Sequence, residues 1–164
     1  MLTLEGSQKA PGMKFAIVVS KFNDFVTDRL QAGAIEALES AGVAGDDICV
    51  IKVPGAFEIP FGAREAASRG HFAAVVCLGC LIRGKTPHFE YISSACAHGI
   101  TDAAASTGVP MSFGVLTTNS IEEALERVVD GPTNKGWEAA IAAVEMATLQ
   151  RSLRQPRPSK SMNV

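Results

Sequence analysis

The chain has 164 residues, of which 47% are hydrophobic and 20% charged, and its formal net charge is −2. This length and composition are typical of one globular domain with a substantial core. The small negative charge argues against a nucleic-acid partner. No apolar run is long enough to span a bilayer, and residues 1–12 lack the basic and apolar regions of a secretory signal. We therefore expect a cytoplasmic protein with no membrane partner.

Strand and helix patterns alternate along the chain. The apolar runs predict strands over residues 14–19, 48–53, 73–81 and 111–116. Helical spacing predicts helices over 25–41, 57–69 and 87–106, a short helix that begins after a Ser120/Glu123 capping box and runs to 129, and a last helix that Asn134 opens and that runs to 153. Four such units in series predict an α/β fold with a central four-stranded parallel sheet, helices on both faces and right-handed crossovers.

The two ends differ from this domain, which we assign to residues 14–154. Residues 1–13 form an arm that could supply an additional edge strand at Leu2–Leu4, too short to be stable without a partner. Residues 155–164 contain two prolines and are predicted to be a disordered tail with solvated basic residues.

Four cysteines, Cys49, Cys77, Cys80 and Cys96, lie in apolar segments, which favours reduced thiols that pack as small core residues. Cys77 and Cys80 form a Cys-x-x-Cys, but a strand points these two side chains to opposite faces. No second pair completes a zinc set. The sequence therefore predicts neither a metal site nor a redox centre.

The segment from Leu78 to His88 runs from a buried strand through a polar loop into a helix. Gly84 permits close backbone approach, Thr86 can cap the helix, and Pro87 suits its first position, which leaves His88 in the first turn. Backbone N–H groups and the helix dipole would then face a phosphate, and the dipole would keep His88 neutral and able to accept a proton. A simple turn with a surface histidine explains this segment equally well.

Ligands of parallel sheets bind beyond the carboxyl ends of the strands. Phe22 follows the first strand at a loop position, where its ring could stack on a flat heteroaromatic ligand. For Phe57, after the second strand, we favour a ring that folds back onto its own helix. Glu58 either favours the helix dipole or accepts hydrogen bonds from hydroxyl or ring N–H groups.

Two cations near the end of the chain differ in how well local structure explains them. Arg127 lies late in a helix, where a positive charge is favourable. Lys135 directly follows the cap Asn134, and a cation at a helix N-terminus is unfavourable unless an anion lies close by. The segment T-N-K-G-W-E therefore indicates a helix start that faces a ligand.

Five segments together match the motifs of one known family. They are V-P-G-A-F-E-I-P from Val53, G-C-L-I-R-G-K-T-P-H-F-E-Y from Gly79, F-G-V-L-T-T from Phe113, E-R from Glu126 and N-K-G from Asn134. In order and spacing, over residues 14–151, they resemble the lumazine synthase family. The resemblance implies a flavodoxin-like three-layer sandwich and a cofactor-free condensation of 5-amino-6-(D-ribitylamino)uracil with 3,4-dihydroxy-2-butanone 4-phosphate, the penultimate step of riboflavin biosynthesis.

The resemblance also implies roles for individual residues. Phe22 would stack on the pyrimidine, Ala56, Phe57 and Glu58 would hold the ribityl chain and ring edge, and Leu81 and Ile82 would also bind substrate. Lys85, Thr86 and Arg127 would bind phosphate, and His88 would transfer protons. Phe113, Arg127 and Lys135 would reach the pocket from a neighbouring subunit.

The same resemblance implies assembly into pentamers. The segment from Arg127 to Lys135 has the short form, which accompanies a sixty-subunit shell of twelve pentamers. Two alternatives remain at this point. A non-catalytic flavin or lumazine carrier would not need a phosphate loop with a nearby histidine and arginine, and a purely structural shell protein would not need the polar residues at all.

Overall fold

A computed structural model describes residues 1–155; of the tail predicted to be disordered, all but Gln155 lies outside the described residues. The strands are β1 (Phe15–Ser20), β2 (Ile48–Val53), β3 (Ala74–Ile82) and β4 (Met111–Thr118). They form one parallel sheet in the order β2-β1-β3-β4. The predicted four-stranded parallel sheet is confirmed, and each predicted strand end is correct to within two residues.

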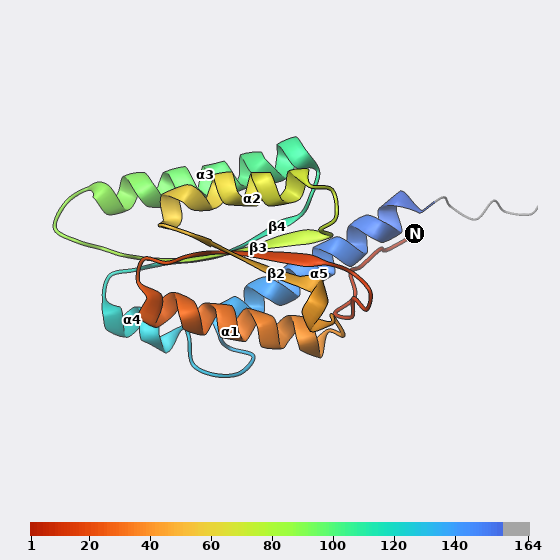
Figure 1. Cartoon of the computed structure of the whole chain (residues 1–164), viewed down its shortest axis with the longest axis horizontal. Coiled ribbons are helices and arrows are strands. Elements are labelled where there is room, and N and C mark those ends of the chain that lie inside the picture. Colours follow the sequence, from red (N-terminus) through yellow and green to blue (C-terminus); the bar gives the residue numbers. More distant parts are fainter. Residues whose placement is uncertain (156–164) are drawn as a thin grey trace, which may run out of the picture.

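Helices cover both faces of the sheet (Figure 1). One face carries α1 (Asp24–Ser40), α5 (Lys135–Arg154) and the short α4 (Ile121–Glu126); the other carries α2 (Ile59–Ser68) and α3 (His88–Thr107). Short 3₁₀ turns, η1 (Gly45–Asp47) and η2 (Ala56–Glu58), lie on either side of β2. None of the helices within residues 1–155 combines the length and the apolarity that crossing a bilayer requires.

The core is split by the sheet into two layers. All six residues of β1 are buried, and they alternate between the layers, with Ile17 toward α1 and α5 and Val18 toward α2 and α3. Cys80 and Cys77 likewise face opposite layers, as predicted. Cys49 is exposed, so its assignment to the core was wrong. The reason is that β2 is an edge strand, whose residues are buried mainly at its carboxyl end.

Several predicted helix ends differ from the structure. The cap of α3 is Pro87, with no side-chain cap hydrogen bond, so Thr86 does not cap this helix and His88 is its first residue. The helix predicted from residue 57 begins instead as the separate turn η2. α4 ends at Glu126 rather than at 129, and Gly131, at φ 99°, helps the chain to turn back. The turn is closed where the Lys135 N–H donates to the Arg127 carbonyl oxygen at 2.9 Å.

The N-terminal arm contributes no strand to the sheet of its own chain, so the predicted edge strand is not formed within the described residues. Leu2 and Leu4 are exposed. The following residues are attached to the helical layer, since the Ser7 N–H donates to Thr148 Oγ1 at 2.8 Å and the Ala10 N–H donates to the Ala41 carbonyl oxygen at 2.9 Å. A three-residue strand without a partner is too short to persist, which explains the difference.

Candidate active site

The loops that follow the four strands meet at the carboxyl end of the sheet, on the left in Figure 1, where α1, α3 and α4 begin. We call this end of the strands the carboxyl edge of the sheet. The predicted site residues fall into two groups at and near this edge. We call the first the His88 group: Phe22, Ala56, Phe57, Glu58, Leu81, Ile82, Lys85, Thr86 and His88. We call the second the Arg127 group: Phe113, Arg127 and Lys135.

The loop after β1 is fixed to both neighbouring strands. The Phe22 N–H donates to the Pro54 carbonyl oxygen at 3.1 Å, and Asn23 Nδ2 donates to the Cys80 carbonyl oxygen at 2.8 Å. Asn23 has φ 61°, the only positive φ of a non-glycine residue in the described part of the chain, and asparagine tolerates this conformation better than most residues. The loop therefore holds Phe22 between the ends of β2 and β3, with 69% of the side chain exposed and its ring accessible for stacking.

The turn after β2 orients a carboxylate. Glu58 Oε2 accepts the Gly55 N–H at 3.0 Å, and the Glu58 N–H returns a bond to the Gly55 carbonyl oxygen at 3.2 Å. Ala56 is buried, whereas Phe57 is 59% exposed. More than half of the Phe57 side chain is therefore accessible, and the packing of its ring onto its own helix stays a prediction.

The loop after β3 presents its polar side chains to solvent. Leu81 and Ile82 are half-buried, and Lys85, Thr86 and His88 are all exposed. The N-terminus of α3 lies at this loop, so the positive end of the helix dipole is directed to the same place. The combination can receive an anion beside an imidazole.

The Arg127 group lines a separate hollow of about 450 Å³ beside β4 and α5. Phe113 is exposed on β4, Arg127 follows α4, and Lys135 begins α5. The lining includes no residue of the His88 group. Both cations have partners in their own chain, since Arg127 Nη1 donates to the Glu123 carbonyl oxygen and Lys135 Nζ donates to Glu138 Oε2, each at 2.7 Å.

The start of α5 is fastened to the middle of α1. The predicted cap is confirmed, because Asn134 Oδ1 accepts the Gly136 N–H at 2.8 Å, and its Nδ2 donates to the Arg29 carbonyl oxygen at 3.2 Å. A Cβ atom at Gly136 would collide with the Leu30 carbonyl, and one at Gly33 would collide with Asn134. Lys135 is thereby held in a fixed place relative to α1.

Two residues near the site were assigned no role from the sequence. Glu138 pairs with Lys135 and lines the same hollow, and its position three residues after a lysine on one helix was an available signal. Arg83 contacts Glu90 and Asn119, and its link to Asn119 joins residues too far apart in sequence to be expected from spacing.

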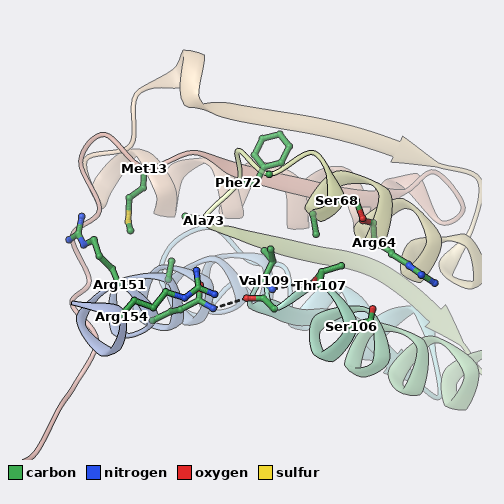
Figure 2. Close-up of a pocket in the computed structure, with 15 residues that line it drawn as sticks. Met13, Arg64, Ser68, Phe72, Ala73, Ser106, Thr107, Val109, Arg151 and Arg154 are labelled. Carbon is green, nitrogen blue, oxygen red and sulfur yellow. Dashed lines mark hydrogen bonds between the residues drawn. The ribbon is translucent and has the colours of Figure 1, made fainter. Parts of the chain in front are cut away.

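A larger hollow, of about 670 Å³, lies at the opposite edge of the sheet, beside the segments that lead into β1, β3 and β4 (Figure 2). In this view Arg64 and Arg151 lie at opposite ends of the hollow. The hydroxyl groups of Ser68 and Thr107 donate to carbonyl oxygens of their own helices. Because these two arginines are apart and these two hydroxyl groups are bonded within their own helices, we assign the candidate site to the carboxyl edge of the sheet.

Comparison with known proteins places the chain in one family. The family described as 6,7-dimethyl-8-ribityllumazine synthase matches residues 12–151. Relatives of that name from Syntrophus aciditrophicus (strain SB), Desulfatibacillum aliphaticivorans and Desulfosudis oleivorans (strain DSM 6200 / JCM 39069 / Hxd3) are 53%, 47% and 49% identical over 149, 146 and 146 residues. These matches cover 91%, 89% and 89% of this chain and 97%, 94% and 93% of the relatives. The chain therefore belongs to the 6,7-dimethyl-8-ribityllumazine synthase family.

Proposed function

We propose that this chain condenses 5-amino-6-(D-ribitylamino)uracil with 3,4-dihydroxy-2-butanone 4-phosphate to give 6,7-dimethyl-8-ribityllumazine, phosphate and water, the penultimate step of riboflavin biosynthesis. The observation that carries the activity is the family match over residues 12–151, with a relative of that name 53% identical across 97% of its length. The exposed Phe22 ring, the exposed Lys85 side chain and the half-buried Glu58 carboxylate at the carboxyl edge of the sheet support the assignment of the site.

In the proposed site, Phe22 stacks on the pyrimidine and Glu58 accepts hydrogen bonds from the ring edge or ribityl chain. Glu58 is suited to this because its bond to the Gly55 N–H orients the carboxylate before substrate arrives. Lys85 and Thr86 bind the phosphate of the second substrate at the positive end of α3. His88, the first residue of that helix, relays protons between the reacting atoms.

The chemistry requires no cofactor in this proposal, because the substrate amine is a nucleophile and the second substrate carries its own leaving group. Imine formation, loss of phosphate, tautomerisation, ring closure and dehydration each move protons, which His88 can accept and return. Orienting two reactants is worth roughly 7–11 kcal/mol, whereas general acid–base catalysis typically contributes about 10²–10⁴-fold. We therefore assign most of the acceleration to positioning.

We further propose that a complete pocket needs two chains, with the Arg127 group of one chain facing the His88 group of its neighbour. Three observations support this. The hollow beside the Arg127 group excludes the His88 group, β2 and β4 both end the sheet with open edges within the described chain, and Leu2 and Leu4 are exposed. An open strand edge is a ready partner for a short strand of another chain.

The short segment between Arg127 and Lys135 supports a shell of twelve pentamers rather than isolated pentamers. Light scattering and electron microscopy of the purified protein test this assembly. A mass equal to five chains at high protein concentration would contradict the shell and leave the enzymatic proposal intact.

The activity itself is tested by mixing the two substrates with purified protein and following lumazine absorbance together with phosphate release. We expect both signals to rise in parallel. A carrier or a purely structural shell protein would bind the lumazine or form particles without producing either signal above the uncatalysed rate, and that outcome would contradict the proposed function.

A further inference from the structure

Arg83 lies at the carboxyl end of β3, immediately before the loop of residues 84–87. Its guanidinium has partners in several elements. Nε donates to Asn119 Oδ1 at 3.0 Å, Nη1 pairs with the Glu90 carboxylate in the first turn of α3, and Cζ lies 4.5 Å from the centre of the Phe89 ring. The backbone N–H of Arg83 also donates to the Thr118 carbonyl oxygen at 2.8 Å. Arg83 thus joins both ends of this loop to the end of β4.

The contacts continue from Asn119 to the Arg127 group. The Asn119 N–H donates to Glu123 Oε2 at 2.8 Å, and the Glu123 carbonyl oxygen accepts Arg127 Nη1 at 2.7 Å. The start of α3 and the turn that leads to Arg127 are therefore tied to one guanidinium. The loop between Arg83 and the start of α3 carries Lys85 and Thr86, and His88 directly follows this loop.

The ion pair of Arg83 does little for folding. The two side chains are 47% and 52% exposed, and exposed ion pairs contribute little to stability. The Glu90 backbone N–H and the Arg83 side chain both hold the pKa of the Glu90 carboxyl below its usual range, which keeps this carboxylate charged. A planar guanidinium that bonds two acceptors and lies over a ring cannot be replaced by the single ammonium of a lysine.

We propose that Arg83 is a positioning residue for the phosphate-bearing substrate. It fixes the loop of residues 84–87 and the first turn of α3, so that Lys85, Thr86 and His88 meet the substrate in one geometry. In this proposal Arg83 acts through these residues, because Nε, Nη1 and one face of its guanidinium are already engaged by Asn119, Glu90 and Phe89. This inference rests on the proposed function of the site.

The kinetic test uses Arg83→Met, Arg83→Lys, Glu90→Gln and the double variant Arg83→Met/Glu90→Gln, with Arg64→Met as the control at the opposite edge. Misplacing a binding group by 1 Å can cost 10²-fold, and we expect Arg83→Met to raise the KM of the butanone phosphate about tenfold, with the KM of the pyrimidine changed less than about twofold. We expect the KM of the butanone phosphate to be raised in Arg83→Lys as well. Glu90→Gln shows a smaller effect of the same kind, and the double variant is no worse than Arg83→Met.

Two kinetic outcomes would overturn the inference. Rescue by Arg83→Lys together with an unaffected Glu90→Gln would mean that Arg83 binds phosphate directly as a charge. Kinetics within about twofold of the wild type for every variant would mean that the pair is only a solvated surface contact. Thermal unfolding and light scattering confirm that each variant is folded and assembled.

A second measurement separates this inference from the activity itself. Amide hydrogen exchange followed by mass spectrometry reports how firmly residues 84–91 are held, with no substrate present. We expect faster exchange in this segment for Arg83→Met and no change for Arg64→Met, while exchange in α5 is the same in both variants. Unchanged exchange of residues 84–91 in Arg83→Met contradicts the positioning role, whether or not the wild-type protein forms lumazine.

Discussion

The His88 group and the Arg127 group are ordered in different ways. In the His88 group the backbone is bonded from strand to strand, through Phe22 to Pro54 and Asn23 to Cys80, while the ring of Phe22 and the side chain of His88 are exposed. In the Arg127 group the charged ends of the side chains are themselves bonded within the chain. The first group thus offers accessible side chains on a fixed backbone, and the second offers oriented cations at an open hollow. This difference suits the proposed pocket between two chains, in which each group must be ordered before the two chains meet.

Mixing two inactive variants tests whether the two groups meet across chains, and it carries the largest expected effect. Phe22→Asp disables the His88 group, and Arg127→Glu disables the Arg127 group, so each homogeneous protein should be nearly inactive. In oligomers reassembled from equal amounts, about a quarter of the pockets combine two intact groups if adjacent chains share each pocket. We therefore expect lumazine formation to return to about a quarter of the wild-type rate.

Two controls make this mixing experiment decisive. Mixing the variants without prior dissociation should give no recovery, and the reassembled particles should match the wild type in size by light scattering. If the two groups served one pocket within the same chain, every pocket would keep one defect, and activity would stay at background after reassembly.

His88→Ala tests how much the proton relay adds to a site built for positioning. We expect kcat to fall by about 10²-fold without vanishing, because general acid–base catalysis is one part of the acceleration and orientation of the two substrates persists. Single-turnover measurements of lumazine absorbance give the rate. Complete loss of activity in a folded and assembled His88→Ala protein would refute the dominance of positioning.

Arg127→Ala tests whether the Arg127 group contacts only the phosphate-bearing substrate. We expect the KM of the butanone phosphate to rise about tenfold and that of the pyrimidine to change little, because the removed guanidinium would form charge-assisted hydrogen bonds to phosphate alone. Steady-state kinetics with each substrate varied in turn provide the measurement. Equal effects on both KM values would show that Arg127 does not contact the phosphate.

The alkylation rate of Cys80 reports how firmly the loop that carries Phe22 is held to β3, and we expect the smallest change in this experiment. Burial raises the pKa of the Cys80 thiol to about 11, so this thiol stays protonated through pH 7–9 and should resist alkylation throughout that range. Asn23→Ala removes the hydrogen bond to the Cys80 carbonyl oxygen, and we expect alkylation there to accelerate a few-fold as local opening becomes easier.

Peptide mass spectrometry of the alkylated protein measures this change. Cys96 is the internal control, because burial raises the pKa of its thiol to about 11 as well, but it lies in the opposite core layer, against α2 and α3. Equal alkylation rates of Cys80 in the wild type and in Asn23→Ala would show that the bond between Asn23 and the Cys80 carbonyl oxygen does not hold the loop.

The fold could be predicted from local patterns because each pattern reflects burial by neighbours in the chain. The apolar run before Leu78 predicted a central strand. Asn134 predicted a helix start, since its side-chain oxygen accepts only from residues two and three positions ahead. Thr86 satisfied the same local rule and still does not cap α3. The residue type at a helix start is therefore not enough to tell which side chain caps the helix.

The site was less predictable because its organisation depends on partners far apart in sequence. The exposure of Phe57 and the contact between Arg83 and Asn119 follow from how three strand ends are placed, which periodicity does not encode. That Arg127 and His88 line different surfaces of one chain was expected only through the resemblance to a family. The proposed meeting of these two surfaces across chains remains a prediction.

The close contact of Gly33 and Gly136 with the opposite helix has a consequence for symmetry. α1 begins directly after the Phe22 loop, and its middle contacts the start of α5 with Lys135. The orientation of the His88 group relative to the Arg127 group is therefore fixed inside each chain. In a ring closed by unlike surfaces, that orientation sets the rotation from one subunit to the next. The absence of a Cβ atom at Gly33 and Gly136 would then help to determine how many chains close the ring.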